Sequence, residues 1–204
     1  MSTKITWLSV FFVTLIWSGI GPKDQLTWFL EVLPAIIGLV IILATRARFP
    51  LTSLLYFLIL VHSLVLMVGG HYTYAEVPLG EWCKSWFGWE RNNYDKLGHF
   101  LQGFVPAILA RELFIRHNVV NGNGWRHLFI ISVCLGFSAF YELIEWWVAL
   151  LSDEAADSFL GTQGYIWDTQ SDMMYALTGA VTALLTLSQF HNRQLSLLKR
   201  ADFE

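Results

Sequence analysis

The segment TWFLEVLPAIIGLVIILAT, residues 27–45, decides the fold class of this chain. Glu31 is its single ionisable side chain, and its length is close to the about 20 apolar residues with which a helix crosses a bilayer. The whole chain is 55% hydrophobic and 14% charged, whereas soluble domains have about 45–50% apolar and about 25% charged residues. The mean hydropathy is +0.49. The sequence therefore predicts an all-α integral membrane protein.

Five further segments have the same apolar character, so we expect six transmembrane helices in all. The six predicted spans cover residues of about 4–20, 27–45, 51–70, 95–115, 127–150 and 168–189. Turn-forming residues occupy the connections at 21–22, 48–50 and 121–124. A chain of 204 residues then forms a single bundle, which we expect to be one polytopic membrane domain over residues 1–204.

The longest connection, about residues 71–94, differs from the spans in composition. It contains Trp82, Trp86 and Trp89 among alternating charges. Tryptophan is enriched where a membrane meets water, so this segment is predicted to lie at the interface.

The distribution of basic residues predicts that both termini are cytoplasmic. With the N-terminus inside, nine of the 13 basic residues fall on the cytoplasmic side: Lys4, Arg46, Arg48, Arg111, Arg116, Arg126, Arg193, Lys199 and Arg200. The other four, Lys23, Lys84, Arg91 and Lys96, fall outside, and cytoplasmic loops carry the excess of positive charge. The connection between the last two spans has Asp153, Glu154 and Asp157 without any cation, which favours the same orientation. No basic run is long enough to indicate nucleic-acid binding.

Three stretches place ionisable groups within predicted spans: Asp95-Lys-Leu-Gly-His99, Glu142-Leu-Ile-Glu145 and Asp168-Thr-Gln-Ser-Asp172. Each charge in a bilayer costs about 2.5–3.5 kcal/mol, so such groups are rare and face the bundle interior. Residues three, four or seven apart share a helix face. The predicted stripes are Asp95, His99, Gln102 and Pro106; Ser138, Glu142 and Glu145; and Asp168, Asp172, Tyr175 and Gly179. In the predicted orientation all three meet at the outer, periplasmic face.

Carboxylates with imidazole in a half-buried pocket are suited to a divalent metal such as Zn²⁺ or Mn²⁺. We expect His99, Glu142 and Asp172 to be metal ligands, with Glu142 and Glu145 as acid–base groups. Asp95, Gln102 and Asp168 are expected to support them. A proton relay is a second interpretation, because acids and histidines within membranes also mark pumps and transporters.

A purely structural interpretation stays open beside these two. The acids can pair with Lys96, His71 or backbone groups, and interhelical hydrogen bonds of this kind are common in membranes. At predicted helix starts, Asp95 and Asp168 can act as N-caps. Arg111 and Glu112 are interpreted as a local pair near the cytoplasmic end of their span.

The same segments resemble a known family. Asp95-Lys-Leu-Gly-His99-Phe-Leu-Gln-Gly-Phe, Tyr141-Glu-Leu-Ile-Glu145-Trp-Trp and Gly161-Thr-Gln-Gly-Tyr-Ile-Trp-Asp-Thr-Gln-Ser-Asp172-Met are similar to the YjdF family of bacterial inner-membrane proteins. The resemblance covers nearly the whole chain. It implies a multi-pass protein of the bacterial inner membrane whose biochemical function is uncharacterised.

A more distant similarity is to VanZ-like membrane proteins. Asp95, Lys96, His99 and Phe100 match the first part of their pattern, and Glu142 matches the second. Asp172 and Gly179 match the third part. The chain departs from the pattern at Glu145, where that family has Gln, and at Ala176, where it has Asn. The resemblance implies a role in the cell envelope.

Three functions are compatible with these observations. The first is a metal-dependent hydrolase or transferase that acts on a lipid or a lipid-linked envelope substrate at the periplasmic face. The second is a small proton-coupled transporter, and the third is a non-catalytic envelope protein that binds a lipid or a partner. The residues do not decide whether the protein is an enzyme, and they do not indicate its oligomeric state.

Overall fold

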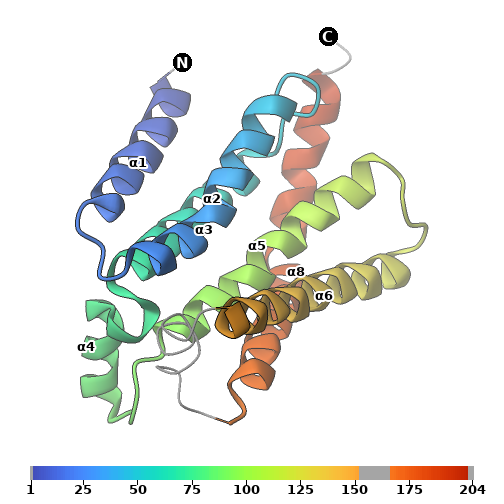
Figure 1. The fold of residues 1–204 in the computed structure, drawn as a ribbon. Coiled ribbons are helices and arrows are strands. Elements are labelled where there is room, and N and C mark those ends of the chain that lie inside the picture. The colour runs from blue at the N-terminus through green and yellow to red at the C-terminus, as the bar shows by residue number, and fades with distance from the viewer. Residues whose placement is uncertain (1, 152–165, 202–204) are drawn as a thin grey trace.

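The computed structural model describes residues 2–151 and 166–201, which are helical over most of their length (Figure 1). The elements are α1 (Ser2–Gly19), α2 (Gln25–Thr45), α3 (Ser53–Tyr72), the 3₁₀ turn η1 (Tyr74–Glu76), α4 (Pro78–Phe87), α5 (Tyr94–Arg116), α6 (Asn123–Leu151) and α8 (Asp168–Ala201). The described residues contain no strand. The acidic connection with Asp153, Glu154 and Asp157 lies outside the described residues.

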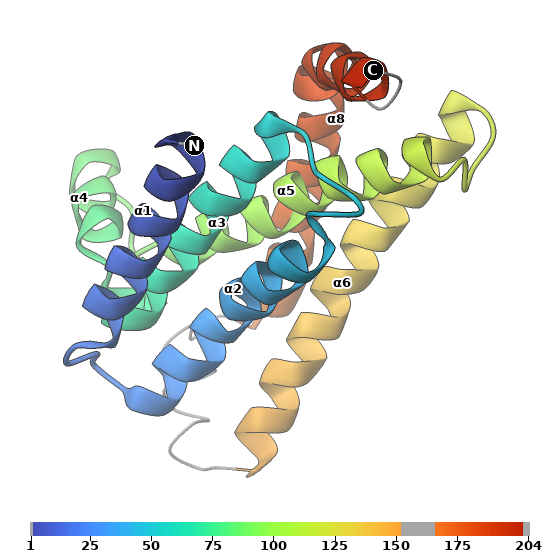
Figure 2. The ribbon, with the colours of Figure 1, turned by 90° about the horizontal axis from the view of Figure 1, so that it is seen from above.

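Helix α5 lies at the centre of the helical bundle. It packs against α3, α6 and α8, while α2 and α1 both pack on α3. Helices α1 and α6 therefore stand at opposite sides of the molecule, as both views show (Figures 1 and 2). The N-terminus and the C-terminal end of α8 lie at the same end of the bundle (Figure 1).

Four helices in the described part of the chain are long and apolar enough to cross a membrane: α2, α3, α6 and α8. They coincide with four of the six predicted spans. Helix α1 is apolar but shorter. Helix α5 has 23 residues, but it carries Asp95, Lys96, Arg111, Glu112 and Arg116. These charges lower its hydropathy, and all but the half-buried Arg116 are buried within the bundle.

Two glycines allow α5 and α8 to approach closely. A Cβ atom on Gly103 of α5 would lie 1.7 Å from the backbone oxygen of Ala176 on α8. A Cβ atom on Gly179 of α8 would lie 2.0 Å from the backbone oxygen of Phe100 on α5. Small residues at crossing points are the usual means by which membrane helices bring their backbones together. The sequence at these two positions therefore fixes the closest helix pair of the bundle.

Helix α8 continues to Ala201, well beyond the predicted end near residue 189. Three polar side chains of this extension contact the neighbouring helices. His191 Nε2 lies 3.0 Å from Glu112 Oε2, and Asn192 Oδ1 accepts from Arg111 at 2.7 Å. Gln194 Oε1 accepts from the Leu54 backbone N–H at 2.8 Å, near the start of α3. Gln194 therefore satisfies one of the amides that the first turn of α3 leaves free.

The interpretation of Arg111 and Glu112 as a pair with each other is wrong. The fully buried Glu112 carboxylate instead accepts from the Thr52 hydroxyl at 2.8 Å and from Arg116 at 3.0 Å. Arg111 points to α8, where it donates to His191 Nδ1 at 3.0 Å. Because a guanidinium only donates, His191 Nδ1 accepts and His191 Nε2 donates to Glu112. This network joins the ends of α3, α5 and α8.

Helix α2 begins with a side-chain cap. The Asp24 carboxylate accepts from the Thr27 backbone N–H at 2.7 Å. This hydrogen bond from the Thr27 backbone is the main reason that the pKa of Asp24 is lowered from its ordinary value. Asp24 therefore stabilises the start of α2 while it is ionised.

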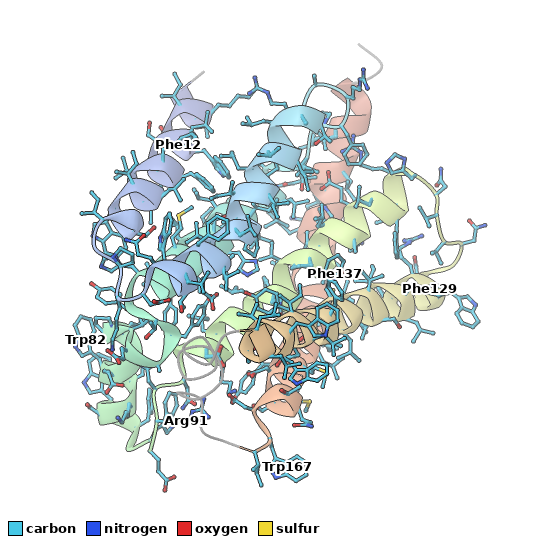
Figure 3. All side chains as sticks on the ribbon, viewed as in Figure 1. Phe12, Trp82, Arg91, Phe129, Phe137 and Trp167 are labelled. Atoms are coloured by element: carbon cyan, nitrogen blue, oxygen red, sulfur yellow. The ribbon has the colours of Figure 1, made fainter. Side chains whose placement is uncertain are left out.

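The predicted interfacial segment contains a helix rather than a loop. Trp82 and Trp86 of α4 are exposed, as are Phe87 and the following Trp89. Trp82 and Trp167 both lie toward the end of the molecule that is remote from the termini (Figure 3). On the longer helices, Phe12, Phe129 and Phe137 point outward (Figure 3). Such an apolar exterior is what lipid-facing helices present.

Candidate functional site: a buried cluster of carboxylates around His99

The structure brings all of the predicted site residues to one end of the bundle, opposite the two termini. Asp95, His99 and Gln102 lie on the first turns of α5. Glu142 and Glu145 lie on the second half of α6, and Asp168 and Asp172 lie on the first two turns of α8. Arg91, just before α5, and Trp167, just before α8, mark this end in Figure 3. The close crossing at Gly103 and Gly179 holds the α5 and α8 groups against each other.

Lys96 connects the acids of α5 and α8. Its Nζ lies 2.6 Å from Asp172 Oδ1, 2.7 Å from Asp168 Oδ1 and 3.5 Å from Asp95 Oδ2. Arg91 is a second cation at Asp168, with 3.3 Å from its Nη1 to Asp168 Oδ1. Lys96 is buried at 8% exposure. It therefore fixes one oxygen of Asp95 and one of Asp172, and leaves the other oxygen of each to face elsewhere.

Those remaining oxygens face one nitrogen of His99. His99 Nε2 lies 3.3 Å from Asp95 Oδ1 and 3.8 Å from Asp172 Oδ2. The opposite nitrogen, Nδ1, lies 3.1 Å from Gln102 Oε1. An amide oxygen only accepts, so Nδ1 carries the hydrogen in this contact. The imidazole is thereby oriented with Nε2 toward the two aspartates.

The α6 glutamates lie on the other side of the imidazole. Glu142 Oε1 is 3.8 Å from His99 Nδ1. Glu142 is 8% exposed and Glu145 is 6% exposed. Within residues 2–151 and 166–201, Glu142 Oε1 and the hydroxyl of Ser138, one turn earlier, have no hydrogen-bond partner. A buried carboxylate oxygen without a partner is costly, so it marks a place where a ligand or a proton is needed.

Among the described residues, two sets of three side chains have donor atoms within 4.8 Å of one another. One is Asp95, His99 and Asp172, and the other is His99, Glu142 and Glu145. The predicted ligand set of His99, Glu142 and Asp172 spans both sides of the imidazole. Asp95, expected only to support the ligands, has an oxygen beside His99 Nε2.

Sequence reasoning noted Glu31 near this cluster but missed the two tyrosines beside it. Glu31 of α2, at 9% exposure, interacts with the hydroxyls of Tyr74 and Tyr141. Burial raises the pKa of Tyr74, in the η1 turn, well above its ordinary value, so this hydroxyl stays protonated. No periodicity marks Tyr74 or Tyr141 as polar groups. Glu31 carried a signal, as the lone charge of its span, but its two neighbours come from η1 and α6, so they depend on how the whole bundle packs.

Two other expectations about these residues are now decided. Tyr175, predicted to lie on the interior stripe of α8, is instead 42% exposed. His71 does not join the acids. Its Nδ1 lies 3.0 Å from the Ser18 backbone oxygen, and its ring packs on Trp17. His71 therefore ties α3 to α1.

These observations define a helical, multi-pass membrane protein with a buried cluster of carboxylates and one histidine near one end. The chain belongs to the family of predicted membrane proteins called DUF2238, which matches residues 3–193. It is 55% identical over 181 residues to the inner membrane protein YjdF of Escherichia coli strain K12, which covers 89% of this chain and 87% of that protein. The resemblance to the YjdF family is thereby confirmed. No solved structure matches the chain.

Proposed function

We propose that this protein is a bacterial inner-membrane protein of six transmembrane helices in a single domain, with both termini in the cytoplasm. The relative from Escherichia coli is an inner membrane protein by name. Both described ends of the chain lie at the same end of the bundle, as an even number of spans requires. Helices α1 and α5 supply the two spans beyond the four apolar ones. The carboxylate cluster then lies toward the periplasmic face, and the excess of basic residues lies inside.

We further propose that the cluster binds a divalent metal ion and that the protein is a hydrolase or transferase. The observation that carries this proposal is the set of three donor atoms on one side of His99. Asp95, His99 and Asp172 each offer one donor atom within 4.8 Å of those of the other two, and His99 Nε2 lies 3.3 Å from Asp95 Oδ1 and 3.8 Å from Asp172 Oδ2. Lys96 holds the other oxygen of each aspartate, and Gln102 orients the histidine ring.

This donor set fits a metal that accepts both oxygen and nitrogen, such as Zn²⁺ or Mn²⁺. A histidine ligand commonly donates its other ring N–H to an oxygen acceptor, which sets the tautomer. The contact from His99 Nδ1 to Gln102 has this arrangement. Three protein ligands leave a coordination position open, and a metal in such a site lowers the pKa of bound water and polarises a phosphoryl or carbonyl oxygen.

Glu142 and Glu145 are the acid–base groups in this proposal. Glu142 Oε1 is buried without a hydrogen-bond partner in the described residues, so it is available to accept a proton from an attacking water or hydroxyl. Glu145 lies beside it on the same face of α6 and faces the same imidazole. Asp168, paired with Lys96 and Arg91, keeps Lys96 in place. Its role is positioning.

The substrate class follows from where the cluster lies. The groups converge on the ends of membrane helices, close to the amphipathic helix α4 with its exposed tryptophans. A substrate that reaches this depth is anchored in the bilayer, so we propose a lipid or a lipid-linked envelope intermediate with a phosphoester bond. The anionic phosphate is drawn to a site whose metal offsets the surrounding carboxylates.

The test is release of phosphate or of headgroup from a panel of phospholipids and polyprenyl phosphates by the full chain in proteoliposomes. We expect turnover that requires added Mn²⁺ or Zn²⁺. Glu142→Gln should lose at least a hundredfold in turnover, the smaller end of the range for general acid–base catalysis, while it still binds the metal. Glu81→Gln, at a half-buried carboxylate on α4 outside the cluster, is the matched control. Turnover that persists in Glu142→Gln, or metal-loaded protein that is inert across the panel, would contradict the enzymatic role.

The same proteoliposome assay distinguishes the two other candidate functions. A proton-coupled transporter would give a pH-dependent flux without bond cleavage. A non-catalytic protein would show neither, and His99→Ala would then lower thermal stability without any separable loss of activity.

A further inference from the structure

A large cavity opens between α1, α2 and α3, at the end of the bundle opposite the carboxylate cluster. Its volume is about 990 Å³, the upper end of the about 300–1,000 Å³ range of small-molecule sites. Its walls are mostly apolar, with Leu39 and Ile42 from α2, Trp7 from α1, and Tyr56 and Leu60 from α3. The cavity exists because α1 packs on α3 and touches α2 only slightly.

Two cations stand at the rim of this cavity. Lys4, near the start of α1, and Arg46, directly after α2, both line it, and both are exposed. In the part of the chain that the structure describes, no aspartate or glutamate lines the cavity. Within residues 2–151 and 166–201, neither cation has an ion pair. The rim is therefore positively charged, and the charge is not offset by the walls.

The depth of the cavity is suited to a lipid. Its lining runs from Thr3 to Val10 on α1, which at 1.5 Å per residue is about 10 Å along the helix axis. On the other side it runs from Leu39 on α2 to Ala47, just past the end of that helix. One end is the charged rim and the other is within the apolar part of the helices. Trp7 closes the α3 side, where its indole N–H donates to the Tyr56 backbone oxygen at 2.8 Å.

We propose that this cavity binds one anionic phospholipid from the leaflet next to the chain termini. Its phosphate lies between Lys4 and Arg46, and the upper part of an acyl chain lies along Leu39 and Ile42. Basic pockets between membrane helices recognise anionic headgroups in this way. The site is separate from the carboxylate cluster, so it goes beyond the proposed function and does not depend on it.

The test measures lipid retention by native mass spectrometry of the full chain, purified in detergent and titrated with dioleoylphosphatidylglycerol or dioleoylphosphatidylcholine. We expect one phosphatidylglycerol to bind at least tenfold more tightly than phosphatidylcholine. Each cation should contribute about fivefold, so Lys4→Gln combined with Arg46→Gln should weaken phosphatidylglycerol binding about 25-fold. The matched control removes two charges elsewhere, through Arg48→Gln combined with Lys84→Gln, and should change binding less than twofold.

A second variant tests the apolar part of the site. Leu43 lines the cavity and is 43% exposed, so Leu43→Trp fills space without replacing a buried side chain. It should weaken phosphatidylglycerol binding at least tenfold with an unchanged thermal unfolding temperature. Equal binding of the two lipids, an equal loss in the control, or displacement of the lipid by inorganic phosphate at comparable concentration would overturn the proposal. The last result would mean that the rim recognises a free anion.

Discussion

Substitution of Gly103 by alanine tests whether the close crossing of α5 and α8 builds the carboxylate cluster. The added Cβ would lie 1.7 Å from the backbone oxygen of Ala176, and real Cβ contacts are essentially never under 3.0 Å. The two backbones must therefore separate by about 1.3 Å, the difference between these values. The nearest atoms to this Cβ all belong to the Ala176 backbone, so the strain cannot be relieved by rotation of a side chain. Such overpacking typically costs about 1–3 kcal/mol.

The displacement also opens the site. Lys96 Nζ lies 2.6 Å from Asp172 Oδ1, and a further 1.3 Å or so would take this contact beyond hydrogen-bond range. We therefore expect Gly103→Ala to lower the thermal unfolding temperature in detergent by about 2–12 °C, from about 2–4 °C per kcal/mol for a chain of this size. We also expect at least a tenfold loss of Mn²⁺ affinity by calorimetry.

The matched control is Gly136→Ala on α6, because a Cβ at Gly136 meets nothing within 4 Å. Alanine is favoured over glycine in a helix by about 0.5–1 kcal/mol, so this variant should be neutral or slightly more stable. Equal unfolding temperatures for the two variants would refute the role of the glycine crossing. So would a Gly103→Ala protein with unchanged metal affinity.

Three further substitutions test other parts of the structure. Lys96→Gln leaves two buried carboxylates without their cation and should destabilise the protein by about 3–5 kcal/mol in chemical unfolding, whereas Lys84→Gln, at the half-buried pair with Glu81 on α4, should change little. Glu112→Gln should cost a similar amount, because the fully buried carboxylate accepts from Thr52, Arg116 and His191; an unaltered unfolding temperature would contradict this network. Asp24 has a lowered pKa, so its stabilising effect is complete above its unfolded value near 3.8 and is lost as the pH falls through the lower folded value. Asp24→Asn should therefore reduce the loss of unfolding free energy on acidification below pH about 4, and identical acid profiles for variant and wild type would rule out the cap.

The sequence predicted the location of the carboxylate cluster because the relevant signal is local. An ionisable group in an apolar span faces the bundle interior. Successive spans run in opposite directions, and this alternation decides which helix ends lie at the same face. Asp95, His99, Glu142 and Asp172 converge for these reasons, and they do so in the structure. The same logic gave four spans that coincide with the apolar helices of the described chain.

The details that depend on packing could not be predicted. Which oxygen of Asp172 faces His99 is decided by Lys96, whose reach across to α8 depends on the crossing at Gly103 and Gly179. The polar extension of α8 is stabilised by hydrogen bonds that join His191 and Gln194 to residues of α5 and α3. Helix propensity alone does not predict these tertiary contacts. Arg111 and Glu112 are adjacent in sequence, so they diverge around the helix to different partners.

The metal content of the purified protein shows whether the carboxylate cluster around His99 binds a divalent metal, as we claim. Elemental mass spectrometry would compare the detergent-purified wild type with Asp95→Asn and His99→Ala, after incubation with Mn²⁺ or Zn²⁺ and removal of the excess. His127→Ala, an exposed histidine on α6, is the matched control. We predict about one metal per chain in the wild type and in His127→Ala, and at least a fivefold lower content in the two site variants. A wild type without metal, or site variants that retain it in full, would contradict the claim and leave the cluster as an ion-pair network.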